Sequence, residues 1–229
     1  MCGRFNLRPN PHELAEAFAT VRGMDVIEAM SARYNIAPTQ QVLCLRNAGG
    51  REFFCAKWGL IPPWAKDAKI GPTCINARTE TIDTKPAFRS AFKRRRCVVI
   101  ADGFYEWRKS DKQPFNVTLK SRQPMPFAGL WETWKSPDGP IESCTICTTT
   151  ANDMMGQLHD RMPIILPREI IDHWLDPDVT DPEELKPLLQ QYPSEHMLSW
   201  PVSKRVGNVR NQGPDLVAPI DAPQELEFG

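Results

Sequence analysis

Short apolar runs with the spacing of β-strands follow one another through most of this 229-residue chain, and they limit its fold more than any other feature. Because proline cannot donate a hydrogen bond within a sheet, the 22 prolines fall mostly at the edges of these runs. The runs 42–46 and 51–58 flank Gly49-Gly50 and are expected to form a hairpin. Further strands are expected at 74–78, 97–100 continuing into 102–107, 115–119, 127–131, 143–149, 162–166 and 198–202.

Helical periodicity is confined to short segments around these runs. Asn10 is positioned to cap a helix that begins at Pro11 and has Phe18 and Val21 on its apolar face. Further helical segments are expected at 84–96, 154–159, 167–175 and 182–191. Together the elements predict an α+β fold, a single domain with a mainly antiparallel, barrel-like or double-sheet β core and peripheral helices.

Composition is that of an ordinary globular protein, with 41% hydrophobic and 24% charged residues. We expect one domain over residues 1–220, followed by an acidic, poorly ordered tail at 221–229. No apolar run is long enough to cross a bilayer, and no secretory leader precedes the first motif. The expectation is therefore a cytoplasmic protein without a membrane partner, and we expect it to be monomeric.

The seven cysteines are an odd number scattered along the chain. Without an export signal, this usage indicates reduced thiols rather than a disulfide framework. Most of them lie in the apolar runs, where a thiol packs as a small core residue. Cys144 and Cys147 have the C-x-x-C spacing, but neither a second pair nor a histidine cluster accompanies them. We expect neither a metal site nor a cofactor.

Charge is distributed unevenly although the formal net charge is zero. Residues 1–125 contain 21 Lys and Arg against 11 Asp and Glu, and residues 126–229 contain 7 against 17, so the two parts carry +10 and −10. This asymmetry indicates an anionic ligand for the first part, unless the two parts interleave in space and their charges cancel.

Cys2 is the most reactive feature of the N-terminal sequence. A residue this small favours removal of the initiator methionine, which would leave one residue with both a free α-amine and a thiol. Their pKa values are roughly 7.7 and roughly 8.5, so near neutral pH both are partly present as nucleophiles. Such a 1,2-aminothiol can attack an acyl carbon through sulfur, or can condense with an aldehyde through nitrogen and close to a thiazolidine. Alternatively, Cys2 is an ordinary small residue near a chain end.

Three further polar islands stand in apolar surroundings. Asn76 and Arg78 are two residues apart on an expected strand and should face the same side. Glu106 lies between two aromatic residues directly after a hydrophobic strand, an environment that favours a raised pKa. His159 immediately precedes an expected strand and titrates near neutrality. With a cysteine, these groups supply the acid, base and nucleophile of a covalent site.

Each of these residues also has a purely structural interpretation. Glu106 could be a salt-bridged surface acid, and His159 could be a packed histidine. Asn76 and Arg78 could be polar residues of an edge strand. The residues alone leave these alternatives open.

Eight short motifs follow one another from residue 1 to about residue 220. They are Met1–Phe5, Arg33–Pro38, Trp58–Pro62, Ile75–Glu80, Ala101–Trp107, Thr148–Asn152, His159–Pro163 and Val202–Asn208. Together they closely resemble the SOS-response-associated peptidase (SRAP) domain family. No single motif is decisive, but the ordered set is highly specific.

The resemblance implies a sensor of abasic sites in single-stranded DNA, which forms a stable DNA–protein crosslink that shields the lesion. By position, Cys2 would be the crosslinking residue after removal of Met1. Glu106 would transfer protons at the α-amine, Asn76 would hold the sugar and the terminus, and His159 would assist ring opening or the reverse reaction as acid or base.

The resemblance also implies a set of DNA-binding residues. Arg4, Arg78 and Arg161 would bind phosphates that flank the lesion, since a guanidinium suits that charge-assisted contact. Pro38 and Trp64 would pack on exposed bases. The family name further implies N-terminal autoproteolysis, so that the thiol peptidase activity would amount to maturation of Cys2.

Two other function classes compete with this interpretation. Met-Cys-Gly also resembles the start of glutamine amidotransferases, which would make the chain an N-terminal-nucleophile amidohydrolase with no role for Glu106 or His159. A non-catalytic single-stranded nucleic-acid binding module would make Cys2 incidental. An abasic aldehyde, however, is the electrophile that requires an amine and a thiol on one residue, whereas a peptidase requires only the sulfur.

Overall fold

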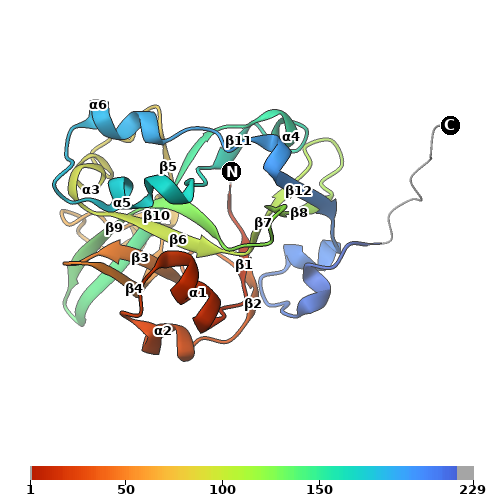
Figure 1. Cartoon of the computed structure of the whole chain (residues 1–229), viewed down its shortest axis with the longest axis horizontal. Helices are drawn as coiled ribbons and strands as arrows, with labels where there is room; N and C mark the ends of the chain where they lie inside the picture. The colour runs from red at the N-terminus through yellow and green to blue at the C-terminus, as the bar shows by residue number, and fades with distance from the viewer. Residues whose placement is uncertain (1, 221–229) are drawn as a thin grey trace.

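A closed β-barrel is the larger β unit of the fold (Figure 1), for which the computed structural model describes residues 2–220. Its strands are β3 (Gln41–Asn47), β4 (Arg51–Trp58), β6 (Arg96–Ala101), β9 (Met125–Ser136) and β10 (Gly139–Thr150). The order β10-β4-β3-β6-β9 returns to β10, because residues 129–136 of β9 pair with residues 139–146 of β10. The β4–β10 pair is parallel and the other pairs are antiparallel. The expected barrel-like, mainly antiparallel core is confirmed.

The far end of β10 carries two short strands beyond the barrel. β5 (Asn76–Arg78) runs parallel to Ile146–Thr148, and β11 (Arg161–Pro163) runs antiparallel to Thr148–Thr150. β10 therefore brings together two of the polar islands that are about 80 residues apart in the sequence.

A second sheet of five strands packs against the barrel. Its order is β12 (Met197–Pro201), β8 (Pro114–Leu119), β7 (Gly103–Trp107), β1 (Phe5–Leu7) and β2 (Arg33–Ile36), with every pair antiparallel. β1 is thus an inner strand, with β7 on one side and β2 on the other. This position fixes the N-terminal segment in the middle of the fold.

Aromatic side chains fill the interface between the sheet and the barrel. The ring of Phe5 lies 5.1 Å from that of Trp58 and 6.3 Å from that of Phe127, measured between centroids. Phe104, opposite Phe5 on β7, lies 6.0 Å from Phe127. All four residues are essentially inaccessible to solvent. Burial of this cluster anchors β1, which begins three residues after Cys2.

The helices are shorter than expected. They are α1 (Pro11–Phe18), α2 (Met24–Glu28), α3 (Arg89–Arg94), α4 (Asp153–Gly156), α5 (Ile171–Leu175) and α6 (Pro182–Leu185). Within residues 2–220 there are also six 3₁₀ turns, η1 (Ala68–Thr73), η2 (Arg168–Ile170), η3 (Lys186–Leu188), η4 (Ser194–His196), η5 (Lys204–Gly207) and η6 (Pro214–Leu216).

Asn10 caps α1 as expected, since its side chain accepts from the N–H groups of His12 and Glu13. The prediction for Val21 was wrong: α1 ends at Phe18 because Ala19 adopts a left-handed conformation (φ 49°), and Val21 is 75% exposed.

Two further helices are shorter than expected. The helix expected from residue 84 begins only at Arg89, after a series of turns that includes Pro86. The helix expected over 182–191 ends after Leu185, and Pro187 lies in the 3₁₀ turn that follows. The end of the helix expected over 84–96 was also wrong. The helix ends at Arg94, and Arg96 is the buried first residue of β6.

The seven cysteines are free thiols, and six of them are buried, as expected from the sequence. Within residues 2–220, no helix is both long and apolar enough to cross a membrane. The same residues contain no group of three or more His, Cys, Asp or Glu side chains that could hold a metal ion. The expected tail at 221–229 lies outside the described residues.

Candidate active site

Cys2 lies three residues before the start of β1, and it is fully buried. The side chain of Asn76, on β5, donates from Nδ2 to the carbonyl oxygen of Cys2 at 2.9 Å. The other amide atom of Asn76, Oδ1, is buried and has no hydrogen-bond partner within residues 2–220. Asn76 therefore fixes the N-terminal segment and has one buried acceptor that is not satisfied within the described residues.

Glu106 lies on β7, beside the N-terminal segment. β7 pairs with β1, and the N–H of Tyr105 donates to the carbonyl of Arg4 at 2.9 Å. The Glu106 side chain is 5% exposed, and its burial raises the pKa of the carboxyl. The interpretation of Glu106 as a surface acid is therefore wrong.

The thiol of Cys2 is held in its protonated form near neutral pH. Burial, and secondarily the charge of Glu106, raise its pKa to about 12. The second cause requires the carboxyl and the thiol to lie within electrostatic reach of each other. The fold thus joins two residues that are 104 positions apart in the sequence.

His159 lies in the loop between α4 and β11 and is partly exposed. Its Nδ1 accepts from the backbone N–H of Arg161 at 3.1 Å, and desolvation lowers the pKa of its imidazole. An ion pair between Lys109 and Asp160 holds this loop against the end of β7. The N–H of Lys109 also donates to the carbonyl of Leu158 at 3.3 Å. His159 is therefore held beside the strand that carries Glu106.

Arg161 joins β11 to the turn that follows β5. Its guanidinium donates to both carboxylate oxygens of Glu80, at 2.8 and 3.1 Å, and to the carbonyl of Thr148 at 2.7 Å. These hydrogen bonds lower the pKa of Glu80. Several N–H donors of Arg161 are thus already used within the protein, beside the turn that follows β5.

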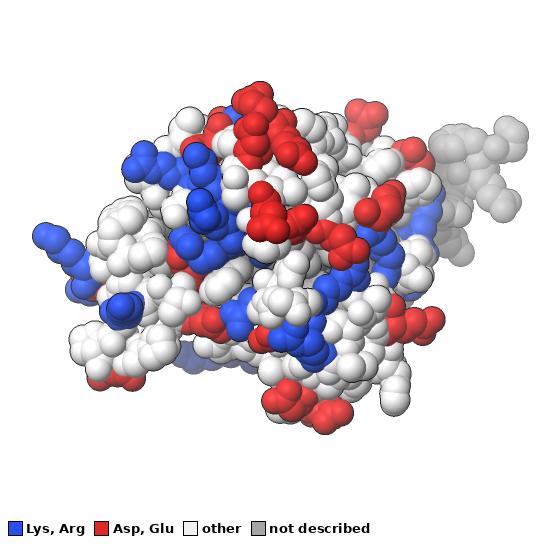
Figure 2. All heavy atoms as spheres, turned by 60° about the vertical axis from the view of Figure 1, so that its left-hand side comes forward, with Lys and Arg blue, Asp and Glu red and all other residues white. Residues whose placement is uncertain are grey.

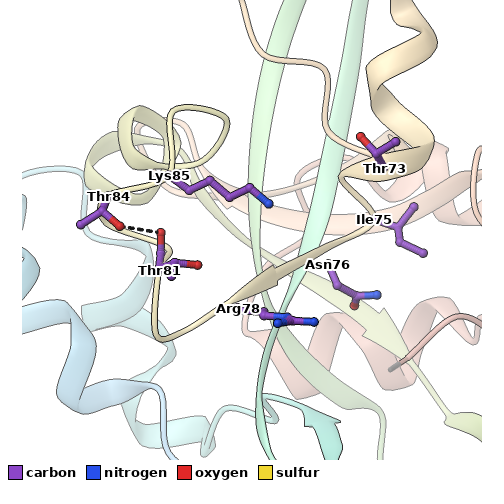
Figure 3. A pocket seen from close by; sticks show the side chains of 7 residues that line it. All are labelled: Thr73, Ile75, Asn76, Arg78, Thr81, Thr84 and Lys85. Carbon is purple, nitrogen blue, oxygen red and sulfur yellow. Dashed lines mark hydrogen bonds between the residues drawn. The ribbon is translucent and has the colours of Figure 1, made fainter.

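A cavity of about 540 Å³ opens along β5 on the side of Asn76 and Arg78. Figure 3 shows Lys85 extending from the turn before α3 toward the strand that carries these two side chains. Ala77, between them, is buried, so the expected alternation along β5 is observed. Lys85 was not among the sequence-predicted site residues, because it lay inside an expected helix and no local pattern distinguished it.

Lys and Arg side chains form a broken band across one face of the molecule (Figure 2). A group of Asp and Glu side chains lies above the middle of this band. Charges are therefore grouped on the surface, and the cationic groups remain available to an anionic ligand.

The side chain of Arg4 is directed away from β5. It donates from Nη1 to Asn35 Oδ1 and to the carbonyl of Val206, both at 2.8 Å. Its guanidinium carbon lies 5.8 Å from the centre of the Trp107 ring. Arg4 thus connects the N-terminal segment to a loop near the C-terminus.

Pro38 and Trp64 lie outside this hydrogen-bonded group. Trp64 is 59% exposed in the loop before η1, and Pro38 is partly buried at the turn between β2 and β3. Trp58 is buried, and its carbonyl accepts from the N–H of Thr39 at 2.7 Å. This hydrogen bond fixes the turn that contains Pro38.

Comparison with known proteins gives one consistent result. The model of the protein family described as "SOS response associated peptidase (SRAP)" matches residues 1–209. The abasic site processing protein YoqW of Bacillus subtilis is 43% identical over 222 residues, which cover 95% of this chain and 99% of that protein. The abasic site processing protein YedK of Escherichia coli is 30% identical over 226 residues, which cover 96% and 100%.

A solved structure has the same fold. The crystal structure of a protein from Bacteroides thetaiotaomicron superposes with a TM-score of 0.84 at 23% identity, covering 96% of this chain and 100% of the other. Because the family match extends over most of the chain and the related proteins match over nearly their whole length, the chain belongs to the SRAP family of abasic site processing proteins.

Proposed function

We propose that this protein captures abasic sites in single-stranded DNA as a covalent adduct of Cys2, after removal of Met1. The observation that carries the proposal is the grouping of a buried thiol at position 2 with the buried carboxyl of Glu106 and the amide of Asn76. The names of the related proteins support an abasic lesion as the target.

The proposed reaction begins when the α-amine of Cys2 adds to the aldehyde of the ring-opened deoxyribose and one water leaves. The product of this step is a Schiff base. The sulfur then adds to the carbon of the C=N bond, and the proton from sulfur is transferred to the nitrogen, which closes a thiazolidine ring. No oxidant or reductant is required, and the adduct has the summed mass of the reactants less one water.

Proton transfer is the role we assign to Glu106 and His159. A carboxyl whose pKa is raised by burial exchanges protons closer to neutral pH, which suits removal of a proton from the attacking amine and its return to the departing water. Because Nδ1 of His159 accepts from the Arg161 N–H, the proton of the neutral imidazole lies on Nε2. We assign Nε2 to the ring oxygen of the sugar during ring opening.

The DNA strand itself would be held by cationic and apolar side chains. We propose that Arg78 and Lys85, in the cavity beside Asn76, contact phosphates next to the lesion. The guanidinium of Arg161 would have to bind a phosphate while it keeps its ion pair with Glu80. Base packing on Pro38 and Trp64 remains a proposal, supported by the high exposure of Trp64.

The acyl-transfer alternatives are less well supported. Thiol peptidases and glutamine amidotransferases use sulfur as a thiolate. Burial raises the pKa of the Cys2 thiol, which disfavours the thiolate. In the crosslinking reaction, the amine carries out the first attack, and Glu106 can accept the thiol proton during ring closure. We therefore restrict any peptidase activity to processing of the N-terminus. A cytoplasmic, monomeric protein remains the prediction made from the sequence.

Intact mass spectrometry tests the proposal. The protein is measured alone and after incubation with a short single strand that contains one abasic site, followed by denaturing separation. The expected result is a starting mass without methionine and an adduct heavier by the oligonucleotide less one water. Cys2→Ala should form no heat-stable adduct, and Cys2→Ser should form only a borohydride-trappable one. A normal adduct from Cys2→Ala, or none from the methionine-free wild type, would refute the proposal.

A further inference from the structure

Asn35 docks a cationic loop beside the N-terminal strand. The loop comprises Lys204–Arg210, and Asn35 lies on β2 with no exposed surface. Nδ2 of Asn35 donates to the carbonyls of Val206, Asn208 and Asn211, at 3.2, 3.0 and 3.1 Å. Oδ1 accepts from Arg4, which also donates to Val206. One buried amide thereby fixes the 204–210 loop relative to β1.

This docking turns the acceptors of the loop inward. The carbonyls of Val206 and Asn208 are bound by Asn35, and the carbonyl of Arg205 accepts from Asn211 Nδ2 at 2.7 Å. The N–H of Val209 has no acceptor within residues 2–220. With three carbonyls occupied and the Val209 N–H unbonded within the described residues, the backbone of the loop presents a weakly positive surface even before its side chains are considered.

The side chains of the loop add to this positive surface. Lys204, Arg205 and Arg210 are exposed, and the segment contains no acidic residue. Arg205 is paired with Asp215 at 2.6 Å. Within the described part of the chain, Lys204 and Arg210 form no ion pair. The loop therefore offers two uncompensated cations to an anionic partner.

The loop lies on the opposite side of Cys2 from the cavity at β5. On one side, Asn76 links Cys2 to that cavity. On the other, Val206 packs with Tyr105 and Trp107 in a small hydrophobic cluster, and Arg4 links it to β1. Figure 1 shows the loop, in blue, beside β2 on one side of β1, and β5 on the other.

We propose that the 204–210 loop binds backbone phosphates on one arm of the single strand, while the cavity at β5 binds the other arm. The inference rests on the proposed function, since Cys2 would hold the lesion between the two arms. A phosphodiester backbone matches the loop because it offers anionic acceptors to Lys204 and Arg210. In this arrangement Arg4 is a positioning residue that holds the loop in place.

Two one-armed oligonucleotides test the assignment. Each contains a tetrahydrofuran abasic analogue, which has no aldehyde, with nucleotides only on its 5′ side or only on its 3′ side. Affinity is measured for the wild type, for the double variant Lys204→Gln/Arg210→Gln and for Arg78→Gln/Lys85→Gln. The matched control is Lys93→Gln/Lys120→Gln, which removes two exposed lysines that form no ion pair within residues 2–220.

The expected result is that each double variant weakens binding of one oligonucleotide only, on the order of tenfold at low salt, and that the two affect opposite arms. For the weakened arm, the slope of log K against log salt should fall by about 1.4, since each lost phosphate contact contributes about 0.7. Loss on the same arm, equal loss on both arms, or a loss no greater than in the control would overturn the inference. Failure of the wild type to crosslink an aldehyde-bearing strand would instead count against the proposed function.

Discussion

The side-chain amide of Asn76 donates to the backbone carbonyl of Cys2 at 2.9 Å, and this is the direct link between the barrel edge and the N-terminal segment. Cys2 is thereby held from β5, while the adjoining β1 is held by β7. A nucleophile fixed in this way reacts with a smaller loss of conformational freedom than a frayed terminus would.

Removal of this link should slow crosslinking without unfolding the protein. For Asn76→Ala we expect the single-turnover rate to fall about threefold to tenfold, because a net hydrogen bond contributes roughly 0.5–1.5 kcal/mol. Asn76→Asp, which keeps the shape but loses the Nδ2 donor, should be slowed at least as much. Thr84→Ala is the control, since Thr84 lines the same cavity without a hydrogen bond to Cys2. Equal rates in all three variants would contradict this role.

Glu106 should determine the acidic limb of the rate profile. Its carboxyl must be deprotonated to accept a proton, and burial raises its pKa above the ordinary 4.5. The rate should therefore begin to fall at a higher pH than an ordinary glutamate would give. Glu106→Gln should remove this limb and lower the rate about a hundredfold or more. An unchanged limb in Glu106→Gln would assign it to another group.

The same shift predicts an effect on stability. A carboxyl whose pKa is raised on folding contributes stability below its unfolded pKa, and that contribution is lost as pH rises through the folded pKa. Glu106→Gln should therefore melt at a higher temperature than the wild type at pH 8, and the two melting temperatures should converge near pH 4. Thermal unfolding at the two pH values measures this difference. A Glu106→Gln variant less stable than the wild type at pH 8 would contradict it.

The local elements of the fold were predictable because their signals are local. Gly49-Gly50 between two apolar runs predicted the β3–β4 hairpin, and the Asn10-Pro11 pair predicted the start of α1. Closure of the barrel was not predictable, since the parallel pairing of β10 with β4 joins segments about 85 residues apart and leaves no periodic signal.

The site residues could be selected but not placed from sequence. Local context singled out Glu106 and Asn76 as polar residues among apolar ones, whereas their proximity to Cys2 depends on both β units. Arg4 shows the limit most clearly. Its acceptor on Val206 is 202 residues away, and nothing near Arg4 in the sequence indicates that its guanidinium is directed to that loop.

Arg96 joins the ends of two helices, and its removal should destabilise the fold. Its guanidinium donates to the carbonyls of Phe92 and Lys93 at the end of α3 and to those of Trp174 and Asp176 at the end of α5. Burial lowers the pKa of this guanidinium to about 10.

Arg96→Met would leave these carbonyls without donors in the interior. We expect a loss of about 2–4 kcal/mol in the free energy of unfolding, measured with urea. Arg94→Met, an exposed neighbour, should change the same quantity by less than about 0.5 kcal/mol. A loss for Arg96→Met as small as that of the control would show that other groups satisfy these carbonyls.

Asn35→Asp should release the 204–210 loop, because the new carboxylate would face three backbone carbonyls that now accept from Nδ2. The loop contains Lys204, Arg205 and Arg210, so trypsin reports its release directly. We expect cleavage within 204–210 to be at least tenfold faster than in the wild type, with the barrel intact. Asn47→Asp is the matched control, since Asn47, at the end of β3, accepts its hydrogen bond through Oδ1 from the N–H of Gly50, and a carboxylate keeps this bond. Cleavage as slow in Asn35→Asp as in the control would mean that the apolar contact of Val206 holds the loop without Asn35.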